Sequence, residues 1–393
     1  MKKRTCHCEE GEARRGNLLK ILACLLALIL LLECLYCVAV FTDWTPLSKL
    51  RDLYIETALG TMNHKWLATA LIPGDIVQRV YEELEAARKA QTGQNSGDWE
   101  LEARPSDSFF DLFPELEESE VRTWAEAHPE AIEHGWDNFY VNQAGLNDSG
   151  TDLYTRQGDQ VLAIDAANGL MVVRIKGERC RGVLILGKDP ARLSCAPAAV
   201  WGESGQRAGE IADANNALVA LTGSGFRDIE GAVEGAEQTG AAMCGGISLG
   251  DHLKPGYKRI ELRRDNKLYV VDAPAEFHPD CTDATEWTPA LIVDGVTVVS
   301  KEDHYNALNP RCCLGQARDG TILMLCIEGR YMDSFGATAP ECAAILARYN
   351  AYQAMNLDGG TSAICWYQGE YITRCSDPDR PEGRLLPNAW IYK

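Results

Sequence analysis

A short polar turn interrupts an apolar run near the carboxyl end of the chain. The segment MNLDGGTS places Asn356 and Asp358 directly before Gly359 and Gly360. A carboxylate beside open backbone N–H groups can act as a base or a nucleophile, or can stabilise positive charge at a reacting carbon. The same residues can also form an Asx-type turn, in which the carboxylate only caps nearby amides. The spacing alone leaves both interpretations open.

A second segment carries side chains that could bind an anion. PRCCLGQARDGTILMLCIEGR begins with Arg311, turns at an Asp-Gly pair, and ends with Glu328 and Arg330. A guanidinium group can bind phosphate or carboxylate through two parallel hydrogen bonds. Glu328 adds a second carboxylate. Because surface hairpins also carry such charges for solubility, the segment by itself does not decide the function.

A glycine-rich loop forms the third candidate segment. LTGSGF, residues 221–226, lets the backbone approach a ligand closely, although a tight turn is the simpler explanation of the loop by itself. No Gly-Lys-Ser/Thr follows, so it is not a nucleoside triphosphate-binding loop. Each of the three segments follows a hydrophobic run typical of a strand. We therefore expect them to converge at one edge of a sheet.

The elements that must position these residues begin near residue 157. QVLAIDA, GLMVVRIKG and RGVLILGKD are short β-rich runs broken by Gly, Asn and Asp. RIELRRDNKLYVVDA is typical of a hairpin, and TAPECAAILARYN of a helix. Helices and strands are mixed without strict alternation. This pattern predicts an α+β domain, with a mixed β-sheet and flanking helices, rather than a doubly wound parallel sheet.

The amino-terminal part predicts a different organisation. Apolar residues from Leu18 to Phe41 are numerous enough to cross about 30 Å of hydrocarbon, and the basic residues that precede or open this run predict a cytoplasmic amino terminus. A cleaved signal peptide is the alternative. We predict a cytoplasmic tail (1–17), a transmembrane helix (18–41), an acidic helical spacer (42–150) with a polar linker near 93–107, and the main domain (151–393).

The net charge and the cysteine content limit which partners and metal sites are expected. The chain has 393 residues and a net charge of −19, which argues against nucleic acid because a phosphate backbone attracts a basic surface. Its 15 cysteines show no zinc-type spacing. Cys365 and Cys375 could bridge a hairpin or remain buried thiols. His64, His278 and His304 have no spacing that supports a metal pair.

The three segments, taken in order, resemble the phosphodiester glycosidase family. Residues 355–393 resemble its Asn-Leu-Asp-Gly-Gly-Gly-Ser-Ser turn, hairpin, Ser-Asp and Arg-Pro pairs and closing strand. The arginine segment resembles Pro-Arg-Thr-Ala-Ile-Gly, a turn and Asp-Gly-Arg, and ALVALTGSGF resembles an Ile-Asn-Ala-Ser-Gly-Phe loop. The resemblance covers roughly residues 56–393. Departures are Thr222 for Asn, Thr361 for the third Gly, Glu328 for Asp, and Cys312-Cys313 for Thr-Ala.

The resemblance implies hydrolysis of a sugar 1-phosphodiester, which releases the sugar and leaves a phosphomonoester. Arg311 and Arg330 would hold the phosphate, Asp358 would act as base, nucleophile or electrostatic stabiliser, and Glu328 would be the second carboxylate. A phosphomonoester leaves readily, so a strong general acid is dispensable. The further expected substrate-binding residues, through backbone amides or polar side chains, are Thr222, Gly223, Ser224, Gly225, Asn356, Gly359, Gly360, Thr361, Ser362, Arg384 and Asn388.

The resemblance also implies a cellular location and a substrate class, and it leaves alternative functions open. We expect a membrane-anchored outer-face enzyme acting on envelope or exopolysaccharide glycans, without a cofactor; a divalent cation at Asp358 is the alternative. The departures leave open a non-catalytic glycan-binding domain that scaffolds exopolysaccharide assembly. A third hypothesis is an enzyme that cuts the P–O bond instead of the C–O bond.

Overall fold

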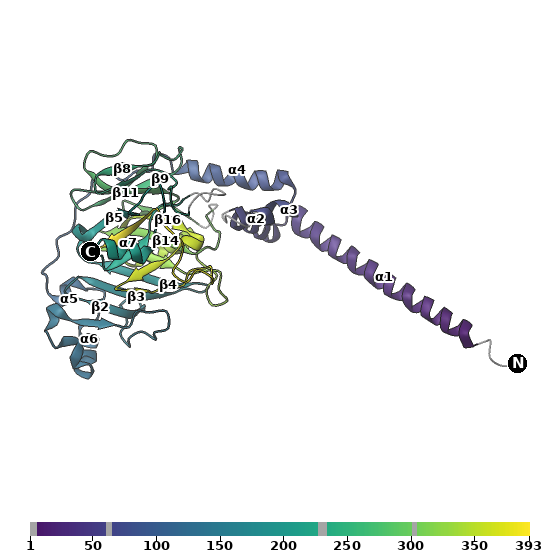
Figure 1. Cartoon of the computed structure of the whole chain (residues 1–393), viewed down its shortest axis with the longest axis horizontal. Coiled ribbons are helices and arrows are strands. Elements are labelled where there is room, and N and C mark those ends of the chain that lie inside the picture. The colour runs from purple at the N-terminus through teal and green to yellow at the C-terminus, as the bar shows by residue number, and fades with distance from the viewer. Residues whose placement is uncertain (1–5, 60–64, 227–233, 301–304) are drawn as a thin grey trace. The chain divides into compact units, whose positions relative to one another are not determined.

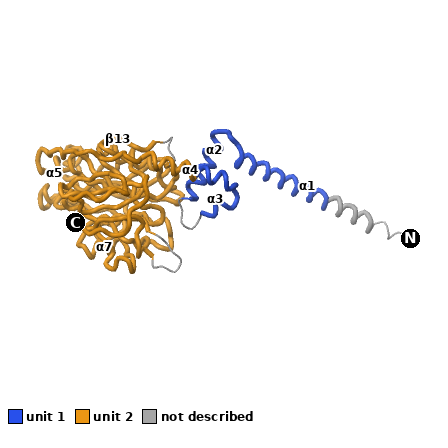
Figure 2. The backbone as a smooth tube through the Cα atoms, turned by 90° about the horizontal axis from the view of Figure 1, so that it is seen from above, with its two compact units in different colours: residues 1–59, 63–80 blue, residues 60–62, 81–393 orange. Residues whose placement is uncertain are grey.

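The protein is described from a computed structural model of the whole chain (Figure 1). Backbone is described for residues 6–59, 65–226, 234–300 and 305–393, and side chains from residue 18 onward within these ranges. Two compact units are present. Unit 1 comprises residues 1–59 and 63–80, and unit 2 comprises residues 60–62 and 81–393 (Figure 2).

Unit 1 contains the long apolar helix that the sequence predicts. Helix α1 spans Cys6–Phe41, and its stretch Leu18–Phe41, 24 residues long, is apolar and almost wholly exposed. Helices α2 (Thr45–Leu59) and α3 (Trp66–Ala70) follow, and α4 (Gly74–Ala90) runs from unit 1 into unit 2.

A nine-stranded sheet is the centre of unit 2. Every pair of neighbouring strands in it is antiparallel, because hairpins rather than crossover helices connect most of them. The Asp-Gly pair at 319–320 forms the predicted turn between β14 and β15. In spatial order the strands are β1 (Tyr140–Asn142), β2 (Gln160–Asp165), β3 (Leu170–Lys176), β4 (Arg181–Gly187), β15 (Ile322–Ile327), β14 (Arg311–Ala317), β16 (Ala351–Gly359), β12 (Ala290–Val293) and β13 (Val296–Thr297).

Two five-stranded antiparallel sheets complete the β structure. One has the order β10 (Leu268–Asp272), β9 (Lys258–Arg263), β11 (Cys281–Trp287), β7 (Ala242–Cys244) and β8 (Ile247–Leu249). The other has the order β18 (Glu370–Tyr371), β17 (Cys365–Tyr367), β6 (Val219–Thr222), β19 (Asn388–Tyr392) and β5 (Leu193–Pro197).

Alternation of apolar side chains creates two cores on opposite faces of the nine-stranded sheet. On β4, Leu184 and Leu186 join a core with helix α8 (Ala339–Arg348), whereas Val183 and Ile185 join a core shared with both five-stranded sheets. Each fully buried side chain of this kind contributes roughly 1.5–3 kcal/mol. Helix α7 (Ala208–Ala214) packs on the remaining face of the sheet that contains β6.

The α+β class is confirmed, since antiparallel sheets and flanking helices form the domain. Contacts place residues 81–150 within unit 2, and the division into a spacer (42–150) and a main domain (151–393) stays a prediction. This segment contains α5 (Phe109–Leu112), α6 (Glu118–Ala127) and the short 3₁₀ helices η1 (Pro129–Ile132) and η2 (Trp136–Asn138); η3 (Pro190–Arg192) and η4 (Gly360–Ser362) lie further along.

Candidate active site

Strand ends bring two of the three candidate segments together in the nine-stranded sheet. Strand β14 begins at Arg311, and its antiparallel neighbour β16 ends at Gly359, the residue directly opposite. Because antiparallel neighbours place the start of one strand beside the end of the other, the arginine segment and the Asp358 turn lie at one edge.

The third segment reaches the same place from another sheet. Strand β6 ends at Thr222, and the backbone N–H of Asp358 donates to the carbonyl oxygen of Gly223 over 3.3 Å. Strand β19, which pairs with β6, begins here with Asn388. All three polar segments therefore meet where the two sheets touch.

Arg311 is fixed by three contacts of its guanidinium group. Nε donates to the carbonyl of Ala337 over 2.8 Å, one terminal nitrogen donates to the carbonyl of Ala307 over 2.9 Å, and the other lies 3.4 Å from Oδ1 of Asn356. The amide nitrogen of Asn356 donates to the carbonyl of Thr288 over 2.9 Å. Arg311 and Asn356 thus hold each other in place, and the half-buried arginine keeps part of its surface toward solvent.

The Gly-Gly turn after Asp358 is required by close backbone packing. A Cβ at Gly359 would lie 2.6 Å from the carbonyl oxygen of Pro310, and Gly360 has φ +62°, which disfavours other residues. The N–H of Gly360 donates to that same carbonyl over 2.9 Å. Thr361 lies one residue further on, half-buried in η4, so its side chain does not meet this constraint.

Arg330 lies against the Gly-Gly turn. A Cβ on Gly360 would lie 3.3 Å from a terminal nitrogen of Arg330, and the other terminal nitrogen donates to Oγ of Ser376 over 3.3 Å. The side chain reaches solvent, yet desolvation by surrounding protein lowers the pKa of its guanidinium. Its backbone has φ +66°, a costly conformation for a residue with a side chain, which a functional position often tolerates.

Glu328 is committed to ion pairs. Its Oε1 accepts the backbone N–H of Arg374 over 3.1 Å, and its Oε2 contacts the guanidinium of Arg374 at 2.6 Å and that of Arg181 at 3.6 Å. Asp333 pairs with both arginines, at 3.0 and 3.3 Å. The buried Glu328 therefore holds together the loops that carry Arg330 and Ser376.

Thr222 uses its hydroxyl within the protein. The hydroxyl donates to the carbonyl of Ser362 over 2.5 Å and accepts the N–H of Ile364 over 3.3 Å, and the side chain is fully buried. Ser362 is buried as well. Thr222 thereby fixes the return of the chain after the Gly-Gly turn.

Ser224 and Asn388 form a buried pair behind the glycine-rich loop. Oδ1 of Asn388 accepts the N–H of Ser224 over 2.8 Å, and its amide nitrogen donates to Oγ of Ser224 and to Oε1 of Gln238 over 3.1 and 2.9 Å. A Cβ at Gly223 would lie 2.2 Å from Asn388 Oδ1, so this close packing excludes other residues.

Arg384 is occupied by neighbours in this region. Its Nε donates to a carboxylate oxygen of Glu234, and its guanidinium lies 4.4 Å from the ring centre of Phe226. The side chain is buried. It contacts the end of the glycine-rich loop.

The sequence did not point to Ser376, to Trp287, or to the two arginines that bind Glu328, Arg181 and Arg374. Ser376 belongs to the Ser-Asp pair noted after the hairpin, so that motif was the available signal. Trp287 is half-buried against the glycine-rich loop, where a Cβ on Gly225 would lie 2.5 Å from its ring. No polar pattern marks Trp287 in the sequence.

The cysteines of the carboxyl-terminal hairpin are unpaired buried thiols. Cys365 and Cys375 are both free, and Sγ of Cys375 contacts the carbonyl of Thr361 at 3.3 Å. Of the two expectations, a disulfide or buried thiols, the structure agrees with buried thiols. Burial raises the pKa of the Cys375 thiol, so it stays protonated at neutral pH.

Within the described ranges, no group of three or more His, Cys, Asp or Glu side chains is arranged to hold a metal ion. His64 and His304 lie outside these ranges. The predicted absence of a cofactor, and the alternative of a cation at Asp358, both stay predictions.

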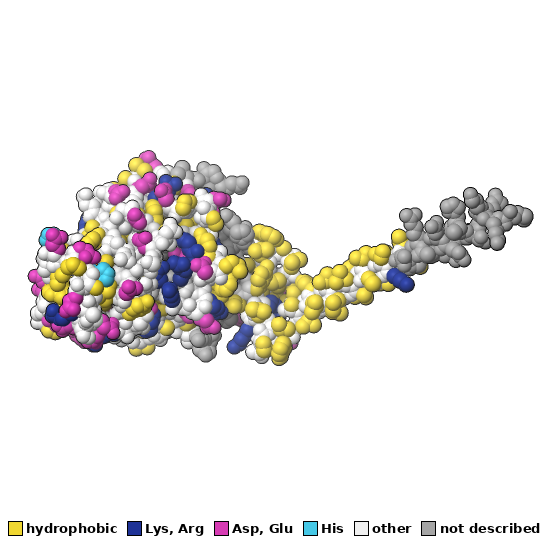
Figure 3. Space-filling view, turned by 90° about the horizontal axis from the view of Figure 1, so that it is seen from below, with side chains coloured by type: hydrophobic (Ala, Val, Ile, Leu, Met, Phe, Trp, Pro, Cys, Tyr) yellow, Lys and Arg dark blue, Asp and Glu magenta, His cyan; other side chains and the backbone are white. Residues whose placement is uncertain are grey.

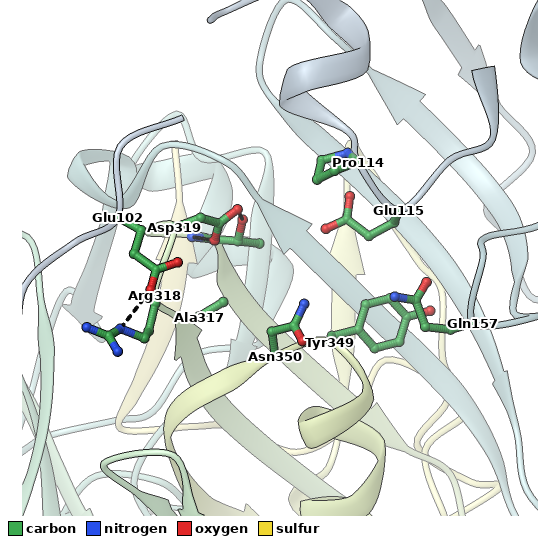
Figure 4. Close-up of a pocket in the computed structure, with 10 residues that line it drawn as sticks. Glu102, Pro114, Glu115, Gln157, Ala317, Arg318, Asp319, Tyr349 and Asn350 are labelled. Carbon is green, nitrogen blue, oxygen red and sulfur yellow. Dashed lines mark hydrogen bonds and ion pairs between the residues drawn. The ribbon is translucent and has the colours of Figure 1, made fainter. Parts of the chain in front are cut away.

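A cavity of about 220 Å³ lies at the other end of β14 and β15 (Figure 4). It is lined in part by Glu115, Asp319 and Asn350, and an ion pair of 3.2 Å between Glu102 and Arg318 closes one side. Because β14 runs from Arg311 to Ala317, this cavity is separated from the candidate site by the length of the strand.

These observations define an antiparallel α+β domain whose strand ends gather two arginines and a carboxylate around a Gly-Gly turn. Residues 215–393 match the model of the phosphodiester glycosidase family.

Individual proteins also resemble parts of the chain. YomE, an uncharacterized protein derived from the SPbeta prophage of Bacillus subtilis (strain 168), is 35% identical over 178 residues, which are 42% of this chain and 27% of YomE. The chain thus matches about a quarter of that relative's length. The catalytic domain of zebrafish N-acetylglucosamine-1-phosphodiester alpha-N-acetylglucosaminidase, auto-inhibited by its pro-peptide, matches with a TM-score of 0.47 and 16% identity over 66% of this chain and 90% of that one. A hypothetical protein from Synechocystis matches with a TM-score of 0.43 and 13% identity over 59% and 63%.

Proposed function

We propose that the chain hydrolyses the bond between a sugar and phosphate in a sugar 1-phosphodiester. The match of residues 215–393 to the phosphodiester glycosidase family supports this reaction class. The observation that carries the proposal is the placement of Arg330 against the Gly-Gly turn that follows Asp358. A cation against the turn that carries a carboxylate matches the two charges that this reaction needs.

The departing group is a phosphomonoester, and Arg330 is placed to bind it. The guanidinium offers planar N–H donors to phosphate oxygens, and protein that desolvates it strengthens its attraction for an anion. Because the phosphate leaves as a stable anion, little proton donation is needed. Arg311, fixed by Ala337 and Ala307, would assist by binding a further phosphate oxygen or by holding Asn356.

Asp358 would act on the anomeric carbon. Its carboxylate stands at the end of β16, half-buried, beside Gly359 and Gly360. We propose that it acts as base for water, as nucleophile, or as electrostatic stabiliser of the oxocarbenium-like state. The hydroxyls of Thr361 and Ser376 would bind sugar or phosphate oxygens.

Glu328 has a positioning role in this proposal. Both of its oxygens face Arg374, so it maintains the loop of Arg330 and does not need to meet substrate. This commitment of the second carboxylate also favours a second candidate function, a non-catalytic domain that binds envelope glycans. Only the first candidate, the hydrolase, would turn over a sugar 1-phosphodiester.

Helix α1 would place the reaction outside the cytoplasm. We propose that residues 18–41 cross the membrane as an uncleaved signal anchor with a cytoplasmic amino terminus, so that unit 2 acts on envelope or exopolysaccharide glycans. The intact mass of the membrane-extracted chain tests this, since a cleaved signal peptide would shorten it.

Hydrolysis in oxygen-18 water tests the reaction itself. The full chain in detergent is incubated with a sugar–phosphate–sugar diester, and label in the sugar is expected because the C–O bond breaks. Label in the phosphate would show P–O cleavage, and binding without turnover would show the glycan-binding domain. Asp358→Asn should lower kcat by about 10²–10⁴-fold, whereas the exposed Asp280→Asn should not; equal activity in both variants would remove Asp358 from the mechanism.

A further inference from the structure

Hydrogen bonds from three side chains of unit 1 join the end of α1 to the helices that follow it. One terminal nitrogen of Arg51 in α2 donates to the carbonyls of Val40 and Thr42 over 2.7 and 3.4 Å. The carbonyl of Val40, in the last turn of α1, therefore has a charged donor, which satisfies a group that a helix end leaves open and complements the helix dipole. Helix α2 is thus fixed against the carboxyl end of α1.

Helix α3 is tied both to α2 and to α1. The hydroxyl of Tyr54 in α2 donates to the carbonyl of Leu67 over 3.2 Å, and the hydroxyl of Tyr36 in α1 donates to the carbonyl of Leu71 over 2.6 Å. Tyr36 precedes the end of α1 by five residues, or roughly 7–8 Å along the helix. The chain after α3 therefore returns alongside α1 instead of leaving it.

The surface of this arrangement is apolar and aromatic. Five large uncharged side chains of unit 1 are exposed to solvent, and we call them the collar. With their exposed fractions they are Trp44 (64%), Leu50 (62%), Tyr54 (45%), Trp66 (59%) and Leu71 (69%). Figure 3 shows hydrophobic side chains that cover α1 and continue over the rest of unit 1. Large exposed apolar surfaces mark sites of interaction with a partner or a membrane.

The contact of Tyr36 with Leu71 sets the depth of the collar relative to α1. If the hydrocarbon begins at Leu18, about 30 Å of apolar thickness takes up about 20 residues and ends near Tyr36. Leu71 then lies at the boundary between acyl chains and headgroups, where Trp and Tyr rings are preferred. The collar is continuous with the surface that faces lipid.

We infer that the collar lies in the headgroup layer of the bilayer, on the side of unit 2, as an interfacial foot beside the transmembrane helix. The occupant of this surface is lipid, because the collar continues the lipid-facing surface of α1 and carries the aromatic composition of a membrane interface. The inference rests on the proposed anchoring by α1 and is independent of hydrolysis.

Tryptophan quenching by brominated lipid tests this inference on the full chain in vesicles. The chain has nine tryptophans, and Trp44 and Trp66 are those of unit 1. We expect lipid brominated near the headgroup end of its acyl chains to quench the wild type, and the double variant Trp44→Phe, Trp66→Phe to lose most of that quenching. Trp124→Phe, which removes a half-buried indole of unit 2, is the control and should leave the quenching unchanged.

Four outcomes would overturn the inference. Quenching that is the same in the double variant and in the wild type would place the collar away from lipid. Strong quenching of Trp44 and Trp66 by aqueous iodide, without an effect of bromine, would place it in water. Shielding from both quenchers together with a dimer in detergent would assign the surface to a second copy. An intact mass that lacks α1 would remove the membrane from the inference, while hydrolysis of the diester could still be measured.

Discussion

The hydroxyl of Thr222 donates a hydrogen bond to the backbone carbonyl of Ser362 over 2.5 Å, and both residues are buried. This bond joins the end of β6 to the turn that follows Asp358. It gives a departure from the family pattern a structural role, since the threonine secures the turn on which the proposed chemistry depends.

Replacement of Thr222 should destabilise unit 2. Thr222→Val keeps the shape but leaves the Ser362 carbonyl and the Ile364 N–H without this partner, which should cost about 1–3 kcal/mol. Unfolding by denaturant, followed by tryptophan fluorescence, measures the change. Thr222→Ser retains the hydroxyl and should lose less; equal losses in both variants would show that the methyl packing, not the hydrogen bond, is important.

Arg330 should show opposite effects on activity and stability. Its φ of +66° suits glycine, so Arg330→Gly should relieve backbone strain and stabilise the fold by about 1 kcal/mol. The same variant should lose most turnover because it removes the proposed phosphate ligand. Thermal unfolding and initial rates measure the two effects.

Asn350 provides the matched control for Arg330. It has φ +58° at the end of α8, far along β16 from Asp358, so Asn350→Gly should stabilise slightly without a change in turnover. Full activity of Arg330→Gly would contradict the proposed role of the guanidinium.

Glu328 should behave as a positioning residue. Glu328→Gln weakens the contacts with Arg374 and Arg181, and it should destabilise unit 2 by about 1–3 kcal/mol. If Glu328 only fixes the Arg330 loop, the remaining activity should show a raised KM with the wild-type pH profile. Disappearance of one limb of that profile would instead assign acid–base chemistry to Glu328.

Glu341 should make stability depend on pH. Burial raises the pKa of its carboxyl, but hydrogen bonds from Thr338 and Arg179 outweigh burial, and the net pKa lies below the usual 4.5. A carboxyl with a lowered folded-state pKa stabilises the fold above its unfolded pKa, and this contribution is lost as pH falls through the folded value.

The variant Glu341→Gln isolates this effect. It removes the charge from the capping box at the start of α8, so it should be less stable than wild type at pH 7 by at most about 1 kcal/mol. The difference should shrink below pH 4.5 and vanish once the wild-type carboxyl is protonated. Unfolding curves at several pH values measure it, and a constant difference would contradict the assigned pKa shift.

Much of the fold follows from patterns within short segments. Apolar runs broken by Gly, Asn and Asp predicted β2, β3 and β4, and the long apolar run from Leu18 to Phe41 predicted the apolar part of α1. The order of three polar motifs indicated the family. These properties depend on residues near one another in the chain, so the sequence alone was sufficient for them.

Pairings between distant residues were decided only by the tertiary structure. Glu328 is predicted as the second carboxylate, and only folding brings Arg374 and Arg181 to it from other elements. Thr222 is predicted as a substrate-binding residue, and only folding brings it to Ser362, 140 residues away. The collar of unit 1 likewise depends on Tyr36 meeting Leu71, because hydrogen bonds across such separations follow from packing and leave no periodic trace in the sequence.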